Sequence, residues 1–86
     1  RENTEWRRRK VKRKILQIVY EPERDRLIWN GWEIHCGQGL EVLLPIRDGS
    51  AVWCPVSFEY NCSGWYMPGQ PGVSPVGLWA RESTEV

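Results

Sequence analysis

The residues with the clearest potential for chemistry are basic side chains near the N-terminus. Residues 1–14 hold eight basic side chains against two acidic ones, a net charge of +6. The rest of the chain holds four basic against nine acidic, a net charge of −5. Lysine and arginine neutralise nucleic-acid phosphates and release counterions, which drives binding, and arginine also matches phosphate oxygens with paired hydrogen bonds. The predicted phosphate contacts are Arg7, Arg8, Arg9, Lys10, Lys12, Arg13 and Lys14. The alternative interpretation of this run is a solubilising arm.

Tryptophan is the second residue type with binding chemistry, and the chain has six. Indole rings stack on bases in proteins that bind single-stranded nucleic acid. Trp6 directly precedes the basic run, and Trp53 is predicted to point away from an apolar strand face, so these two are the predicted stacking residues. Most of the other tryptophans are expected to pack in the core or across hairpins, because large rings bury much area in a small domain.

One histidine and three cysteines invite comparison with a zinc site. Structural zinc sites usually take ligands in pairs two to four residues apart, whereas His35 and Cys36 are adjacent and Cys54 and Cys62 are distant from them. Adjacent side chains on an extended backbone diverge, which also argues against a Cys–His catalytic pair. The sequence contains no phosphate-binding loop or nucleophile elbow. It therefore predicts no catalytic residue, no metal and no cofactor.

Cysteine number and hydropathy bear on the compartment. An odd number of widely spaced thiols is not a disulfide framework and favours a reducing cytoplasm. No run approaches the roughly 20 apolar residues of a membrane span, and no apolar segment follows the basic N-terminus as it does in a signal peptide. We therefore expect a cytoplasmic protein without a membrane partner.

Residues 15–20 are rich in β-branched and aromatic side chains and predict a strand, and residues 51–60 are the longest predicted strand. Alternation in the second strand predicts one apolar face, made of Val52, Cys54, Val56, Phe58 and Tyr60. The opposite face has Trp53, Pro55, Ser57 and Glu59. Pro55 cannot donate a ladder hydrogen bond, which predicts an edge strand or a bulge at this position.

Turn residues separate the predicted strands. Asn30-Gly31 lies between Trp29 and Trp32 and suits the two positive φ angles of a type I′ hairpin. Other turns are predicted at residues 21–25, 35–39, 48–49 and 61–64, with a proline-rich loop at 68–75. Further strands are predicted at 27–29, 32–34, 40–44, 65–67 and 76–81.

This pattern predicts an all-β fold. Short strands at this spacing are typical of a small barrel or roll, and we expect five to six antiparallel strands in an SH3-like arrangement with an extended basic N-terminal arm. The expected divisions are a basic arm at 1–14, a β-barrel domain at 15–82 and a loose tail at 83–86.

Five sequence motifs follow one another in a specific order. They are GWEIHCG at residues 31–37, LEV at 40–42, VWCPV at 52–56, GWYM at 64–67 and VGLWAR at 76–81. In this order, over roughly residues 25–81, the chain resembles the small bacterial and phage β domains of the domain of unknown function 5348 family. It departs from the family pattern at Ile34, at Ser57-Phe58 and in a longer loop at 68–75. The resemblance implies a compact β domain carried by phages and mobile elements of Gram-positive bacteria, and it implies no activity.

Two hypotheses about function follow, both in a bacterial or phage setting. The first is a non-enzymatic module that binds DNA or RNA through the basic arm and an exposed aromatic side chain. The alternative is a protein–protein interaction module, such as a phage-encoded inhibitor of a host defence or nuclease protein, which adds a strand to its partner or mimics phosphate with its acidic domain. A third hypothesis, a nucleotide bound in a tryptophan-lined pocket, also stays open. The partner is thus nucleic acid or a host protein, and the chain is a monomer or a homodimer.

Overall fold

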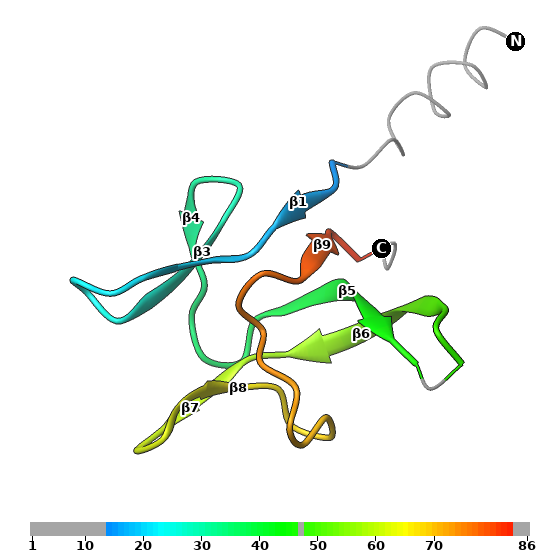
Figure 1. Ribbon diagram of the computed structural model, residues 1–86. Coiled ribbons are helices and arrows are strands. Elements are labelled where there is room, and N and C mark those ends of the chain that lie inside the picture. Colours follow the sequence, from blue (N-terminus) through cyan, green and yellow to red (C-terminus); the bar gives the residue numbers. More distant parts are fainter. Residues whose placement is uncertain (1–13, 47, 84–86) are drawn as a thin grey trace, which may run out of the picture.

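The computed structural model describes residues 14–46 and 48–83. This part of the chain contains nine short strands joined by turns and loops (Figure 1). They are β1 (Leu16–Gln17), β2 (Val19–Glu21), β3 (Arg26–Trp29), β4 (Trp32–Glu33), β5 (Gly39–Pro45), β6 (Ala51–Ser57), β7 (Glu59–Asn61), β8 (Gly64–Tyr66) and β9 (Trp79–Arg81). These residues contain no helix, and all the strand pairs are antiparallel. The all-β prediction is confirmed.

The strands form three sheets, with the orders β1-β9-β5-β6, β2-β3-β4 and β7-β8. Figure 1 shows β9, the last strand, between β1 and β5, so the beginning and end of the domain meet in one sheet. Hydrogen bonds between the described strands do not close the sheets into a barrel. Nine strands are also more than the five to six expected. Two of the predicted strand segments, residues 15–20 and 51–60, are each divided into two strands.

The predicted strands at 15–20 and 51–60 each change sheet at a buried residue. Residues 15–20 form β1 and β2, which divide at Ile18, and residues 51–60 form β6 and β7, which divide at Phe58. Ile18 is 1% exposed and Phe58 is fully buried. A corner at which the side chain enters the core interrupts the simple alternation of a strand. The prediction of two continuous strands was therefore wrong at these two corners.

Backbone hydrogen bonds at both corners connect to loops. The Ile18 N–H donates to the carbonyl of Leu78 at 2.9 Å, and the Ile18 carbonyl accepts from the N–H of Gly77 at 2.7 Å. Phe58 makes the same pair of bonds with residues 37–38, at 3.0 and 2.8 Å. These bonds satisfy backbone groups that would otherwise be buried without partners, so each corner is joined to a loop distant in sequence.

The hairpin predicted at Asn30-Gly31 is confirmed. Asn30 has a φ of 54° and Gly31 a φ of 78°, which are the two positive values that a type I′ turn requires. Trp29 and Trp32 are direct cross-strand partners. Trp29 is nevertheless buried, whereas Trp32 is 60% exposed, so only one of the paired rings contributes to the core.

The hydrophobic core collects residues from strands and corners along the whole domain. Its members are Ile18, Leu27, Trp29, Ile34, Val42, Leu44, Phe58, Met67 and Ala80. The indole N–H of Trp29 points to the carbonyls of Leu16 and Ala80, at 3.1 and 3.2 Å. This donor connects β3 to the adjacent strands β1 and β9, so one side chain holds the three-stranded sheet against the four-stranded sheet.

The edge position predicted from Pro55 is confirmed. Strand β6 is the last strand of its sheet, and Pro55 lies opposite Glu41 on β5. The predicted apolar face of residues 52–60 is only partly buried, because Val52 is 44% and Tyr60 46% exposed. Burial therefore concentrates near Phe58 rather than along the whole run.

The remaining predicted turns are present, and the last strand is shorter than expected. Residues 22–25 and 62–63 connect β2 to β3 and β7 to β8. The N–H of Leu78 donates to the carbonyl of Pro75 at 3.3 Å, so this segment is a turn and β9 begins only at Trp79. No helix in the described ranges has the length and hydropathy to cross a membrane.

Candidate functional site

Most of the predicted basic contacts lie outside the described residues. The predicted site residues outside the described ranges are Trp6, Arg7, Arg8, Arg9, Lys10, Lys12 and Arg13. Lys14 is described and exposed, two residues before β1 begins. Of the predicted tail, only Ser83 is described. The structure thus shows where the basic segment joins the domain: at β1, an edge strand of the four-stranded sheet.

The four-stranded sheet has one face turned away from the core. Ala80, Val42 and Leu44 are buried, so their sequence neighbours on the same strands point to the opposite side. Cross-strand register extends this face over all four strands. We call this the outer sheet face, and it consists of Gln17, Glu41, Leu43, Trp53, Pro55, Trp79 and Arg81.

Trp53 lies on the outer sheet face, as strand alternation predicts, but it is partly covered. The guanidinium carbon of Arg81 lies 4.0 Å from the centroid of a Trp53 ring, which is the geometry of a cation–π contact. Arg81 Nε also donates to Glu41 Oε1 at 2.7 Å. The carboxylate and the indole together hold the guanidinium over the Trp53 ring, on the outer sheet face.

Trp79 is the most exposed aromatic side chain of this face. It is 46% exposed and lies opposite Gln17 on β1, the strand that follows the basic segment. Sequence reasoning missed both Trp79 and Arg81 as surface residues. The two residues flank Ala80, so strand alternation places both on the face opposite to Ala80. A strand of three residues is, however, too short for this alternation to be recognised in the sequence.

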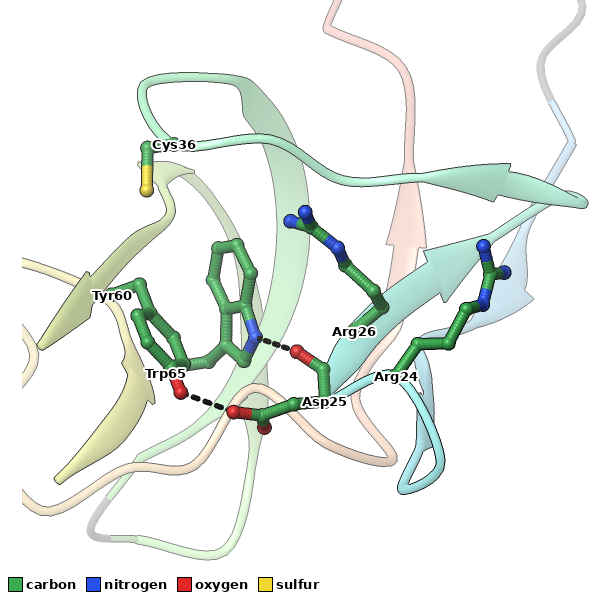
Figure 2. A pocket seen from close by; sticks show the side chains of 6 residues that line it. All are labelled: Arg24, Asp25, Arg26, Cys36, Tyr60 and Trp65. Atoms are coloured by element: carbon green, nitrogen blue, oxygen red, sulfur yellow. Dashed lines mark hydrogen bonds between the residues drawn. The ribbon is translucent and has the colours of Figure 1, made fainter. Parts of the chain in front are cut away.

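A second feature is a surface pocket with a volume of about 240 Å³ (Figure 2). Its lining residues come from four separate segments: Arg24, Asp25, Arg26, Cys36, Tyr60 and Trp65. The Tyr60 and Trp65 rings lie 5.1 Å apart at 59°. Figure 2 shows the Arg26 side chain beside the Trp65 indole, with the thiol of Cys36 at the rim. No local sequence signal could have identified this pocket, because it forms only when distant hairpins meet.

Asp25 holds the pocket together through hydrogen bonds. Its carboxylate accepts from the hydroxyl of Tyr20 at 2.5 Å and from the hydroxyl of Tyr60, and its carbonyl accepts from Trp65 Nε1 at 3.0 Å. Asp25 has a φ of 55°, a conformation that aspartate and asparagine adopt more readily than most residues. The turn at residues 22–25 is thereby connected to both strands of the β7–β8 hairpin.

These hydrogen bonds shift pKa values in opposite directions. Donation by Tyr20, and then by Tyr60, lowers the pKa of the Asp25 carboxyl group. The same bonds raise the pKa of the two tyrosine hydroxyls, because the carboxylate favours their protonated form. The cluster is therefore complete only when the carboxyl group is ionised and both phenols are protonated.

Replacing Asp25 with asparagine tests this cluster, because asparagine also tolerates the positive φ. A lowered pKa means that Asp25 stabilises the fold above its unfolded value of about 3.9, and that this stability is lost as pH falls through the folded pKa. We expect the variant to be less stable than the wild type at neutral pH and the difference to shrink in acid. The raised tyrosine pKa values predict loss of the difference above about pH 10 as well. Urea unfolding of both proteins across this pH range measures the difference in their unfolding free energies. A difference that does not change with pH would contradict the proposed charge states of the Asp25 cluster.

The cysteines and the histidine are not gathered in one site. All three cysteines are free thiols, with Cys36 and Cys62 exposed and Cys54 half-buried. The carbonyl of His35 accepts from the N–H of Gln38 at 3.0 Å, which closes the predicted turn. Within the described ranges, no three histidine, cysteine, aspartate or glutamate side chains are grouped so that they could hold a metal ion.

Fold and surfaces together define a small antiparallel β domain with an aromatic sheet face and an aromatic pocket. The chain belongs to the family described as Domain of unknown function (DUF5348), whose model matches residues 16–81, more than half of the chain. This confirms the family indicated by the motif order and extends the match back to the start of β1. No curated protein and no solved structure matches the chain.

Proposed function

We propose that this chain is a non-enzymatic module that binds single-stranded nucleic acid. The basic arm contacts phosphates, and the outer sheet face stacks on bases. The observation that carries the proposal is an exposed sheet face with Trp79, Arg81 and Trp53. The described end of the basic segment, Lys14, lies two residues before β1, an edge strand of the same sheet.

The aromatic surface supports a single strand rather than a duplex. Sheet faces with aromatic side chains stack two or three bases of single-stranded RNA in known modules, and a guanidinium plane stacks in the same way. One strand, β5, separates Trp79 on β9 from Trp53 on β6. Neighbouring strands are about 4.8 Å apart, so the backbone positions that bear the two indoles are roughly 10 Å apart across the sheet. That separation suits two different bases of one strand.

The charge distribution supports different roles for the arm and the domain in binding. The chain beyond residue 14 has a net charge of −5, which repels phosphates on average. Affinity is therefore expected to come from the arm, whereas the outer sheet face orients the strand. The proposal also includes an SH3-like arrangement of the strands, a bacterial or phage setting and a cytoplasmic location, with no catalytic residue and no cofactor.

Titration of the full chain with short single-stranded DNA and RNA at increasing salt tests the proposal. Each phosphate contact to a single strand contributes a slope of about −0.7 to log K against log salt, so seven contacts predict a slope near −5. Fluorescence anisotropy measures the affinity, and the matching duplex is the control, expected to bind more weakly. Absence of binding at low salt, or binding that does not respond to salt, would refute the proposal.

The second candidate function is protein binding, which the open edge of β6 favours. This edge strand has seven residues and its outer side has no partner strand in the described structure. Such an edge can add a strand from another protein, as an inhibitor of a host defence or nuclease protein would require. A complex from host lysate that survives both nuclease treatment and removal of residues 1–14 would support this function over nucleic-acid binding.

A further inference from the structure

Arg24 and Arg26 both line the pocket of Figure 2, but they differ in what their guanidinium groups already bind. Arg24 Nε and Nη2 donate to Glu21 at 3.0 and 2.8 Å, and Nη1 donates to Glu33. Arg26 makes no side-chain hydrogen bond within the described residues, and its Nε lies 3.9 Å from the nearest Glu33 oxygen. Arg26 therefore has donors available to a ligand, whereas those of Arg24 are occupied.

The aromatic wall beside Arg26 is already held in position. The Trp65 ring is fixed by its N–H bond to the Asp25 carbonyl, and the Tyr60 ring by its hydroxyl bond to the Asp25 carboxylate (Figure 2). A ligand that packs on these rings does not have to order them, which reduces the entropic cost of binding. Arg26 and Trp65 line the same pocket, and Figure 2 shows the Arg26 side chain extending to the Trp65 side of it, so the edge of a flat ring on Trp65 would face Arg26.

Charge around the pocket disfavours a phosphate group. The two arginines are accompanied by three carboxylates, those of Glu21, Asp25 and Glu33. The local charge is therefore not positive, and an anion gains little from entering. The donors of Arg26 suit uncharged acceptor atoms on the edge of a ring.

We infer that this pocket binds a guanine base, stacked on Trp65 and bordered by the tilted ring of Tyr60, with its O6 and N7 atoms accepting hydrogen bonds from Arg26. Arginine donates two parallel bonds to this pair of acceptors, whereas adenine presents an amino donor in place of O6. The volume of about 240 Å³ is below the roughly 300–1,000 Å³ of pockets for drug-sized ligands, which suits one base. The inference deepens the proposed function, on which it rests, by adding a base-specific contact apart from the outer sheet face.

Binding of guanosine to the full chain, measured by titration of amide NMR signals, tests the inference without phosphate. We expect guanosine to shift signals of residues 24–26, 36, 60 and 65, and adenosine at equal concentration to do so much less. Arg26→Lys keeps the charge but loses the paired donors, and should weaken guanosine binding roughly 5- to 150-fold. Trp32→Phe changes an exposed indole outside this pocket and should leave binding unchanged. Equal binding of both nucleosides, or none, would overturn the inference.

The thiol at the rim provides a second readout in the unmodified chain. Guanosine should slow alkylation of Cys36 but not of Cys62, an exposed cysteine in the β7–β8 turn, and peptide mass spectrometry follows both. If both cysteines react at unchanged rates with saturating guanosine, the pocket is not the site.

A comparison of thymine-only nucleic-acid strands with strands that contain one guanine tests whether the pocket also binds the base when it is part of a strand. Tighter binding of the guanine strand, lost in Arg26→Lys, supports the inference. If thymine strands bind with strong salt dependence and guanine adds nothing, the inference fails and the proposed function stands. If guanosine binds and no strand does, the proposed function fails.

Discussion

Phe58→Ala is expected to remove about half of the unfolding free energy of the domain. Phe58 is fully buried at the corner between β6 and β7, where the chain passes from one sheet to another. Truncating a buried phenylalanine to alanine costs about 3–5 kcal/mol of unfolding free energy. A domain of this length has a total stability on the order of 5–10 kcal/mol. The loss is thus about half of the total stability, and urea unfolding followed by tryptophan fluorescence measures it.

Val52→Ala is the matched control for this experiment. Sequence alternation places Val52 and Phe58 on one apolar face, but Val52 is 44% exposed in the structure. Its truncation should change the unfolding free energy by no more than about 0.5 kcal/mol. Phe58→Leu, which retains most of the apolar volume, should be intermediate between the two variants. Equal losses at positions 52 and 58 would show that burial is not concentrated at the corner.

Replacing Arg7, Arg8 and Arg9 together with alanine is expected to weaken binding of single-stranded nucleic acid by about 10²–10³-fold at low salt. Three lost phosphate contacts reduce the slope of log K against log salt by about 2. A slope smaller by this amount corresponds to the expected loss of affinity of about 10²–10³-fold near 50 mM salt. Fluorescence anisotropy with the same strands, over a range of salt concentrations, measures both the affinity and the slope. The unfolding free energy serves as the check that the domain remains folded.

The control for the arm keeps its charge and changes its geometry. Substituting lysine for the same three arginines retains the phosphate charge term but loses the paired hydrogen bonds of guanidinium. The slope should then match that of the wild type, with a smaller loss of affinity. If the alanine variant binds as tightly as the wild type at every salt concentration, the basic arm only solubilises the chain.

Features that depend on near neighbours in the chain were predicted well from the sequence. Asn30-Gly31 produced the expected hairpin, because the φ angles of a two-residue turn are properties of those two residues. Pro55 marked the edge strand, because a missing N–H cannot be supplied by another part of the chain. The all-β class and the family followed from the same local patterns repeated in a specific order.

The candidate binding surfaces were predicted only in part. Trp53 was assigned to the correct face of its strand, but its cover by Arg81 was not foreseen, since residues 53 and 81 meet only through the pairing of β9 and β6 with β5. Trp79 was missed because its strand, β9, has only three residues, too few for alternation to be recognised. The pocket was missed altogether, because Arg26, Cys36 and Trp65 lie on three segments with no shared sequence pattern.

The sequence by itself determined the class of the fold, the positions of its turns and the separation of a basic arm from an acidic domain. These follow from backbone preferences, side-chain alternation and charge, which residues carry whatever their tertiary contacts. The tertiary structure alone decided where strands change sheet, at Ile18 and Phe58, and which aromatic rings remain at the surface. Those outcomes depend on burying apolar area over the whole chain, so a strand bends where its side chain fills the core even though local alternation would continue it. The proposed role of the basic side chains near the N-terminus therefore rests on their charge, whereas that of the sheet face rests on the tertiary structure.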